Sequence, residues 1–178
     1  MSYGLRAESS NPIALSPKLF TMTQIKKLNP DLINKIAAGE VVERPASIVK
    51  ELIENSIDAQ ADQISVDIKK GGTESIIIQD NGQGMTQKDA QLAIERHATS
   101  KISSVEDLFN IQTLGFRGEA LASISSVSQF TLETKAKDAM EGTILQMANS
   151  KWQMDPCGCP EGTKITIKEL FYNNIIYL

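Results

Sequence analysis

Between residues 45 and 80 the apolar residues change from helical spacing to strand spacing, and this change restricts what the chain can fold into. Over residues 45–58 they recur every three or four positions, and Pro45 suits the first turn of a helix. Residues 63–69 then alternate apolar with polar side chains, and residues 74–80 form a more apolar run after a Lys-Gly-Gly turn. A helix followed by such a hairpin predicts an α/β architecture in which helices cover a sheet.

Three further segments carry helix signals. Asp31 can cap a short helix over residues 32–38, which a glycine closes. Thr86, with Asp89 three residues later, can cap a second helix that extends to residue 96. Residues 119–126 are small and apolar, which suits a third helix.

The second half of the chain combines a long irregular segment with a set of strands. From residue 97 to residue 118 small, polar and glycine residues dominate, and a loop of this length is more often a lid or a binding segment than a plain connection. Strand-like apolar runs follow at residues 129–134, 143–147 and 163–168.

Composition and charge agree with one folded domain of ordinary type. The 178 residues include 41% apolar residues, and 18 basic against 22 acidic residues give a net charge of −4. The acidic balance gives no support for nucleic-acid binding by overall charge, although a local basic patch stays possible. No stretch has the length of a membrane span, so a cytoplasmic protein without a membrane partner is expected.

Residues 1–21 are expected to lie outside the fold. They lack the apolar core of a signal peptide and contain serine, asparagine and proline without periodicity. The leader is either disordered, an addition to the natural chain, or an upstream start before Met22. The folded domain is assigned to residues 22–178.

The two cysteines indicate neither a disulfide nor a zinc site. Cys157 and Cys159 flank one glycine, and neighbours this close rarely form an unstrained disulfide. His97 is the only histidine, which leaves too few ligands for zinc. Two reduced thiols in a loop are expected.

A polar stripe runs along the helix expected at residues 45–58. Glu51, Asn55 and Asp58 are four and three residues apart and lie opposite the apolar face. Taken alone, this periodicity favours a solvent-exposed face. A functional site requires a second element over the stripe, because a carboxylate acts as a base only when it is held near its target.

Two glycine-containing segments are candidates for that second element. Residues 80–85, Asp-Asn-Gly-Gln-Gly-Met, follow the buried strand and let the backbone approach a ligand, although Asp-Asn-Gly is also a common turn. Residues 115–120, Gly-Phe-Arg-Gly-Glu-Ala, lead into a helix, and their N–H groups with Arg117 suit an anion. The alternative there is a glycine-closed loop with a surface arginine.

Residues 97–101, His-Ala-Thr-Ser-Lys, place the histidine beside two hydroxyls and a lysine. A lone histidine is more often structural than catalytic. Thr99, Ser100 and Lys101 suit hydrogen bonds to phosphate if the long loop forms a lid.

In their order along one chain, these segments resemble the amino-terminal ATPase domain of the MutL DNA mismatch-repair family. That family belongs to the wider group of gyrase-type, heat-shock-chaperone and histidine-kinase ATPases. The matching segments are residues 36–47, 51–59, 80–85, 96–101 and 114–124. The resemblance implies the gyrase-type ATP-binding fold, an α/β (α+β) two-layer sandwich of a mixed β-sheet with helices on one face.

The resemblance also implies roles for matching residues. Glu51 looks like the general base that activates water for attack on the γ-phosphate of ATP, and Asn55 looks like the Mg²⁺ ligand. Asp80 matches the carboxylate that accepts a hydrogen bond from the adenine amino group. The other residues expected to contact ATP are Gly82, Gly84, Met85, Thr99, Ser100, Lys101, Leu114, Gly115, Phe116, Arg117, Gly118, Glu119, Ala120 and Thr163.

The implied function is Mg²⁺-dependent ATP binding and slow ATP hydrolysis, which would drive lid ordering and dimerisation during DNA mismatch repair. The implied partners of the full-length protein are a second copy of itself, a mismatch-recognition protein and DNA. In a bacterial cell the protein would then work in the cytoplasm at the nucleoid.

After Asn173 the sequence departs from the usual family pattern, which continues Thr-Pro-Ala-Arg-Arg-Lys-Phe. Three explanations of this departure stay open: a frameshift, a truncated gene product, or a chain that was shortened on purpose. In each case the second lobe is expected to be missing, and in this family that lobe carries a lysine that reaches the γ-phosphate. One alternative is therefore a non-hydrolysing fragment that binds nucleotide or DNA. Another is a histidine-kinase-type catalytic domain, which the MutL-like segments argue against.

Overall fold

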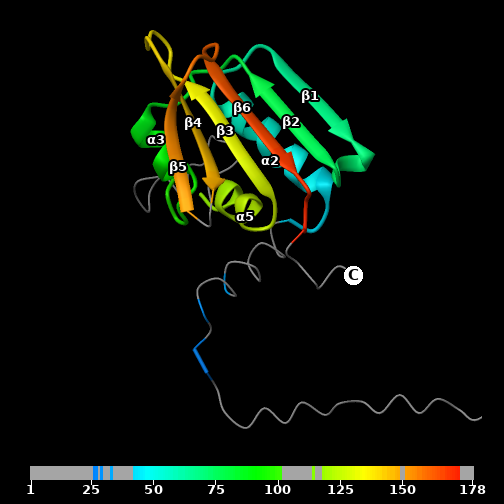
Figure 1. Ribbon diagram of the computed structural model, residues 1–178. Helices are drawn as coiled ribbons and strands as arrows, with labels where there is room; N and C mark the ends of the chain where they lie inside the picture. Colours follow the sequence, from blue (N-terminus) through cyan, green and yellow to red (C-terminus); the bar gives the residue numbers. More distant parts are fainter. Residues whose placement is uncertain are drawn as a thin grey trace, which may run out of the picture.

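A computed structural model describes part of the chain, and this part consists of helices and the strands of one sheet (Figure 1). The described residues are 26, 27, 29, 33, 42–101, 114, 118–148 and 151–172. The leader and nearly all of the helix expected over residues 32–38 lie outside them, as do residues 102–113 and 115–117 of the long loop.

Helix α2 (Pro45–Asp58) confirms the first helix expected from the sequence. Arg44 is extended at the N-cap, and proline occupies the first turn, where its missing N–H costs no helical hydrogen bond. Ile48 and Leu52 are each 1% exposed and point into the core. The apolar stripe of this helix therefore attaches it to the sheet.

The hairpin expected over residues 63–80 is also confirmed. Strand β1 (Ile64–Lys69) pairs antiparallel with β2 (Ser75–Asp80), and a 3₁₀ turn, η1 (Lys70–Gly72), joins them. Gly71 and Gly72 have φ of +63° and +92°, a backbone region that glycine enters without steric cost. The two glycines thus allow the strands to reverse within a short connection.

Two shorter helices follow near their expected positions. Helix α3 (Gln87–Ala93) begins after Thr86, whose hydroxyl accepts a hydrogen bond from the Asp89 N–H at 3.2 Å, as its capping sequence predicted. The helix ends at Ala93, three residues before the expected end. Helix α5 (Ala120–Ser126) matches the apolar segment predicted at residues 119–126.

The strands expected in the second half are confirmed, and a further one is added. The confirmed strands are β3 (Gln129–Lys135), β4 (Gly142–Ala148) and β6 (Gly162–Lys168). The additional strand, β5 (Lys151–Cys157), pairs with β4 at the edge of the sheet. Its Trp152 meets the ring of Phe130 edge to face, with ring centroids 6.1 Å apart.

The strand order of the sheet is β1-β2-β6-β3-β4-β5, and all five described pairs are antiparallel. This corrects the expectation of a mixed sheet. Strands β2 and β3 run in the same direction and would form a parallel pair if they were neighbours. Strand β6 returns between them and is antiparallel to both, so the sheet contains no parallel pair among the described residues.

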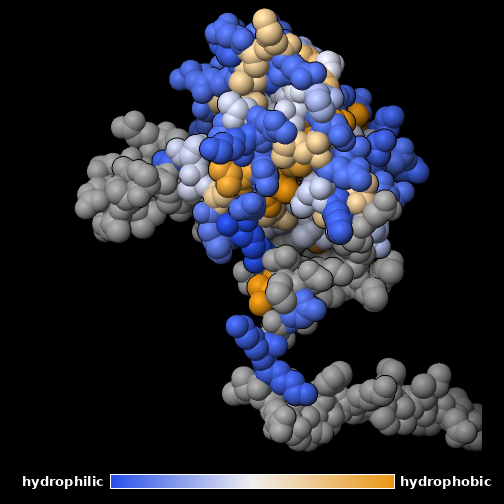
Figure 2. Space-filling view, turned by 60° about the vertical axis from the view of Figure 1, so that its left-hand side comes forward, coloured by the Kyte–Doolittle hydropathy of each residue, from blue (hydrophilic) through white to orange (hydrophobic). Residues whose placement is uncertain are grey.

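The core lies between the sheet and the helices, which cover one face of it (Figure 1). Alternate side chains of the central strands are buried there, including Ile76, Leu132 and Ile167, each with no exposed surface. Figure 2 shows a surface on which hydrophilic side chains surround smaller apolar areas. The two-layer arrangement with helices on one face is thereby confirmed.

The two cysteines were expected to be reduced thiols in a loop. Cys157 ends β5 instead of lying in a loop, and it and Cys159 are free thiols. Burial, together with a hydrogen bond to Cys159, raises the pKa of the Cys157 thiol to about 11.

Among the described residues, none of the helices has the length and apolar character needed to cross a membrane.

Leu52→Ala should lower the free energy of unfolding by about 2–5 kcal/mol, because it leaves a cavity between α2 and the sheet. Ile57→Ala is the matched control on the same helix, since Ile57 is 49% exposed against 1% for Leu52. The control should cost less than about 1 kcal/mol. Equal losses for both variants in urea unfolding would contradict the assigned packing of α2.

Candidate functional site

The polar stripe of α2 is partly buried in the structure. Glu51, Asn55 and Asp58 all lie at intermediate exposure, and the side chain of Asp58 is only 10% exposed. The stripe is therefore not a plain solvated face, which is what its helical periodicity alone had favoured.

Lys101 covers this stripe from the long loop. Its ammonium nitrogen donates to Asn55 Oδ1 at 2.8 Å and to Asp58 Oδ2 at 2.5 Å. The other oxygen of Asp58 accepts a hydrogen bond from the Leu114 N–H at 3.1 Å. Residues on both sides of positions 102–113 thus contact the C-terminal end of α2.

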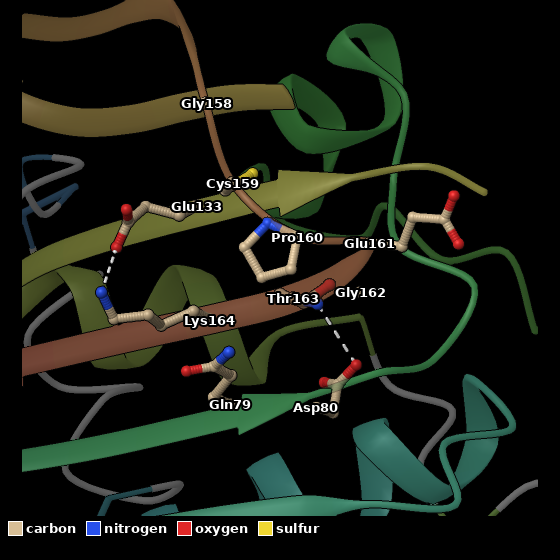
Figure 3. Close-up of a pocket in the computed structure, with 10 residues that line it drawn as sticks. All are labelled: Gln79, Asp80, Glu133, Gly158, Cys159, Pro160, Glu161, Gly162, Thr163 and Lys164. Carbon is tan, nitrogen blue, oxygen red and sulfur yellow. Dashed lines mark hydrogen bonds and ion pairs between the residues drawn. The ribbon is translucent and has the colours of Figure 1, made fainter. Parts of the chain in front are cut away.

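A second cluster is centred on Asp80, the last residue of β2 and a buried carboxylate. Its Oδ1 accepts hydrogen bonds from the backbone N–H of Gly82 at 2.9 Å and of Thr163 at 3.2 Å. Its Oδ2 lies 2.8 Å from the Ser56 hydroxyl of α2. Figure 3 shows the Asp80–Thr163 contact between β2 and β6. One side chain therefore joins α2, β2 and β6.

The hydrogen bonds of Asp80 leave room for one more donor. An ionised carboxylate has about four acceptor positions, two on each oxygen. Within the described part of the chain, Oδ1 accepts two donors and Oδ2 accepts one. The second position of Oδ2 can therefore accept an N–H from a ligand.

The glycines after β2 let the backbone pass close to its neighbours. A Cβ on Gly82 would lie 2.7 Å from the carbonyl oxygen of Ala59. Gly84 has φ of +63°, and a Cβ there would lie 1.9 Å from the carbonyl oxygen of Lys135. Larger residues would push residues 80–85 away from the end of α2 and from β3, so these positions require glycine.

Met85 and Thr163 are joined through Thr134, a fully buried residue of β3. The Thr134 hydroxyl accepts a hydrogen bond from the Met85 N–H at 2.9 Å and lies 3.0 Å from the Thr163 hydroxyl. Sequence reasoning missed Thr134 and Ser56. Their one available signal was a hydroxyl at a position where the strand or helix periodicity expects an apolar side chain.

Gly118 brings two of the sequence motifs together. It has φ of +61°, and a Cβ there would lie 2.5 Å from the carbonyl oxygen of Ala98. Beside this contact, His97 Nδ1 lies 3.0 Å from Oε1 of Glu119, which precedes Ala120 at the start of α5. His97 therefore contacts a candidate residue through an exposed pair, and its structural rather than catalytic role stays a prediction.

Some candidate residues are not joined to the others. In residues 42–101 and 118–172, as far as they are described, no hydrogen bond or ion pair links Glu51 or Ser100 to another candidate. Gly115, Phe116 and Arg117 lie outside the described residues, so the expected phosphate contacts of this loop have no structural counterpart.

A cavity of about 240 Å³ lies beside the Asp80 cluster (Figure 3). Its lining includes two candidate residues, Asp80 and Thr163, together with Gln79, Glu133 and Lys164, and the last two form an ion pair of 2.7 Å. The side chains of Gln79, Glu133 and Lys164 alternate with the buried ones of their strands and therefore face away from the helices. The cavity thus shares Asp80 and Thr163 with the candidate site, but its lining does not include the polar stripe of α2.

The residues of the stripe fit a magnesium ion that also binds phosphate. Among the described residues, no group of three histidine, cysteine, aspartate or glutamate side chains is arranged to hold a metal. Mg²⁺ needs no such set, because it is usually held by one or two oxygen ligands together with waters and substrate phosphates. Asn55 Oδ1 already accepts a cationic group, the ammonium of Lys101, at 2.8 Å.

Two comparisons with known sequences bear on this site. Residues 43–156 match the family described as histidine kinase-, DNA gyrase B-, and HSP90-like ATPase. The DNA mismatch repair protein MutL of Geotalea daltonii is 55% identical over 152 residues, which cover 85% of this chain and 25% of that protein. MutL of Caldanaerobacter subterraneus is 56% identical over 153 residues, with 85% and 26% covered. The chain spans about a quarter of the length of these relatives.

Solved structures of similar fold carry related descriptions. The N-terminal domain of a DNA repair protein is 31% identical with a TM-score of 0.66, covering 82% of this chain and 41% of that chain. The Aquifex aeolicus MutL ATPase domain complexed with ADP is 32% identical with a TM-score of 0.53, covering 75% and 45%. The chain belongs to the histidine kinase-, DNA gyrase B- and HSP90-like ATPase family, in the group of the MutL ATPase domains.

Proposed function

We propose that this chain binds ATP together with Mg²⁺ and that the longer protein hydrolyses ATP slowly during DNA mismatch repair. Family membership and the ADP complex of a similar MutL domain support a nucleotide ligand. The roles of individual residues are proposed from the geometry around α2 and β2.

The open acceptor position on Asp80 carries the proposal. A buried carboxylate oxygen that lacks its full set of donors costs free energy until a ligand supplies one. The exocyclic amino group of adenine is a donor of the required kind. Thr163 and Gly82 fix the orientation of the carboxylate through Oδ1, so Oδ2 is the oxygen proposed to bind the base.

The α2 stripe is proposed to act at the other end of the nucleotide. Asn55 supplies the oxygen ligand for magnesium, and Glu51, one helical turn earlier, accepts a proton from the attacking water. Bound Mg²⁺ would neutralise charge on the phosphate oxygens. Glu51 makes no ion pair with another candidate residue in the described chain, which leaves its carboxylate able to accept that proton.

The candidates of the long loop are proposed to contact the phosphates, whereas Gly82, Gly84 and Thr163 are proposed to lie beside the base. Gly118 packs on Ala98, so residues 99–101 and the start of α5 can approach one ligand together. Lys101 brings a positive charge to this region, and an ion pair with phosphate at about 4 Å is worth roughly 4 kcal/mol at an effective dielectric of 20.

In the longer protein, ATP binding is proposed to order the loop and to promote dimerisation, with a mismatch-recognition protein and DNA as partners. Part of the binding free energy of ATP would then offset the entropy cost of ordering the loop, as in other nucleotide switches. The alternative is a fragment that binds nucleotide without turnover, and it is separated from the main proposal by the Glu51 experiment below.

Asp80→Ala should abolish detectable ATP binding, whereas Asp62→Ala should leave it unchanged. Asp62 is an exposed carboxylate whose contact is to Asn81 at 2.6 Å, so it is a control of equal charge change. Isothermal titration calorimetry with ATP and Mg²⁺ measures both affinities. Retention of wild-type affinity by Asp80→Ala, with native circular dichroism, would remove Asp80 from the base site.

Asn55→Ala should weaken ATP binding by about tenfold or more in the presence of Mg²⁺ and by clearly less in its absence, where only the hydrogen bond from Lys101 is lost. The physical reason is that the amide oxygen binds the metal rather than the nucleotide. The measurement is the ATP dissociation constant with magnesium and with EDTA. An equal loss under both conditions would show that Asn55 does not act through the metal.

Glu51→Ala should keep ATP binding and lower turnover by about 10²-fold or more in a chain extended to the length of the MutL relatives. Turnover is measured by phosphate release, and Glu54→Ala, whose partner is Lys50 at 3.2 Å, is the control on the same helix. Turnover by the extended chain and not by the 178-residue chain would identify the shorter one as a binding fragment. Unchanged turnover in Glu51→Ala would exclude Glu51 as the base.

A further inference from the structure

Asp58 is the residue of the α2 stripe for which neither the motif nor the proposed function supplies a role. We propose that Asp58 is a positioning residue, which holds Lys101 and Leu114 against α2 so that Lys101 is set for the nucleotide. This inference rests on the proposed function and adds a residue to it. Asp58 acts through its two neighbours and does not touch ATP.

The two oxygens of Asp58 have separate partners. Oδ2 forms the ion pair with the Lys101 ammonium at 2.5 Å, and Oδ1 accepts the Leu114 N–H at 3.1 Å. The partners lie 43 and 56 residues further along the chain. One short side chain therefore fixes two distant positions to the end of one helix.

The ion pair is shielded enough from solvent to orient Lys101. The side chains of Lys101 and Asp58 are 19% and 10% exposed, so solvent screens this pair less than a surface pair. A lysine ammonium is a flexible point charge, and its position depends on the acceptors around it. Asp58 and Asn55 supply two of them, both on the stripe that also carries Glu51.

The backbone near Lys101 limits its position further. The Lys101 N–H donates to the Thr99 hydroxyl at 3.1 Å, and Ala98 contacts the position of Gly118. Lys101 thus extends from a short turn whose base is packed on the start of α5, while Asp58 fixes the far end of its side chain.

A double-mutant cycle on the 178-residue chain tests whether Asp58 acts through Lys101. Asp58→Asn and Lys101→Met should each weaken Mg²⁺–ATP binding by about tenfold. The double variant should bind no more weakly than Lys101→Met, because the loss of Asp58 matters only while the ammonium is present. Losses that multiply in the double variant, or wild-type affinity in Asp58→Asn, would overturn the proposal.

A second measurement is independent of nucleotide. Hydrogen exchange of the Leu114 amide should accelerate by about tenfold or more in Asp58→Ala, which removes the acceptor. Asp58→Asn and Lys101→Met both retain an acceptor oxygen at residue 58 and should leave the exchange rate near that of the wild type. Unchanged exchange in Asp58→Ala would show that Asp58 does not hold Leu114.

The matched control is the exposed pair Lys70–Glu74, whose nitrogen and oxygen are 2.9 Å apart. Glu74→Gln removes one carboxylate charge near the start of α2, at the opposite end of the helix from Asp58, and should change neither ATP affinity nor Leu114 exchange. If the wild-type chain fails to bind ATP, the proposed function is wrong, and Leu114 exchange alone decides whether Asp58 is an anchor. If ATP binds and the cycle is additive, the proposed function survives and the role of Asp58 is refuted.

Discussion

The arrangement of the site depends on the buried carboxylate of Asp80. Its three hydrogen bonds reach Ser56 on α2, Gly82 in the following turn and Thr163 on β6. Hydrogen bonds to a charged group contribute about 1.5–3 kcal/mol each, and a buried charge without them would be strongly unfavourable. The same three contacts join the helix to the sheet and fix the orientation of the carboxylate, so they serve both the stability of the fold and the geometry of the candidate site.

The local periodicity of the sequence predicted most helices and strands but not their neighbours in space. Helix α2 and the β1–β2 hairpin follow from spacing that is visible within twenty residues. Strand β5 was missed because an edge strand buries few side chains, and Pro156 reads as a strand breaker although an edge position tolerates it. The antiparallel sheet was missed because β6 is inserted between β2 and β3, and residue order alone does not show that insertion.

The candidate site was predicted in pieces, and the contacts between those pieces are what the sequence could not show. A helical wheel treats the surroundings of Asn55 and Asp58 as water, because Lys101 lies more than forty residues away in the chain. Thr134 was overlooked for a similar reason, since the hydrogen-bond partner of its hydroxyl is Thr163, which lies on the paired strand and is distant in the sequence. The motif resemblance identified which segments belong together, whereas the hydrogen bonds between them are tertiary contacts.

Charge explains why this site would need two kinds of cation. The α2 stripe holds two carboxylates, Glu51 and Asp58, and the chain as a whole has a net charge of −4. A triphosphate brought against that stripe would be repelled by roughly 4 kcal/mol for each like-charge pair about 4 Å apart at an effective dielectric of 20. Lys101 neutralises Asp58 before any ligand arrives, and a magnesium ion at Asn55 would offset much of the remainder. On the proposed function, the two cations would lower the repulsion between the carboxylates of the stripe and a ligand that is itself an anion.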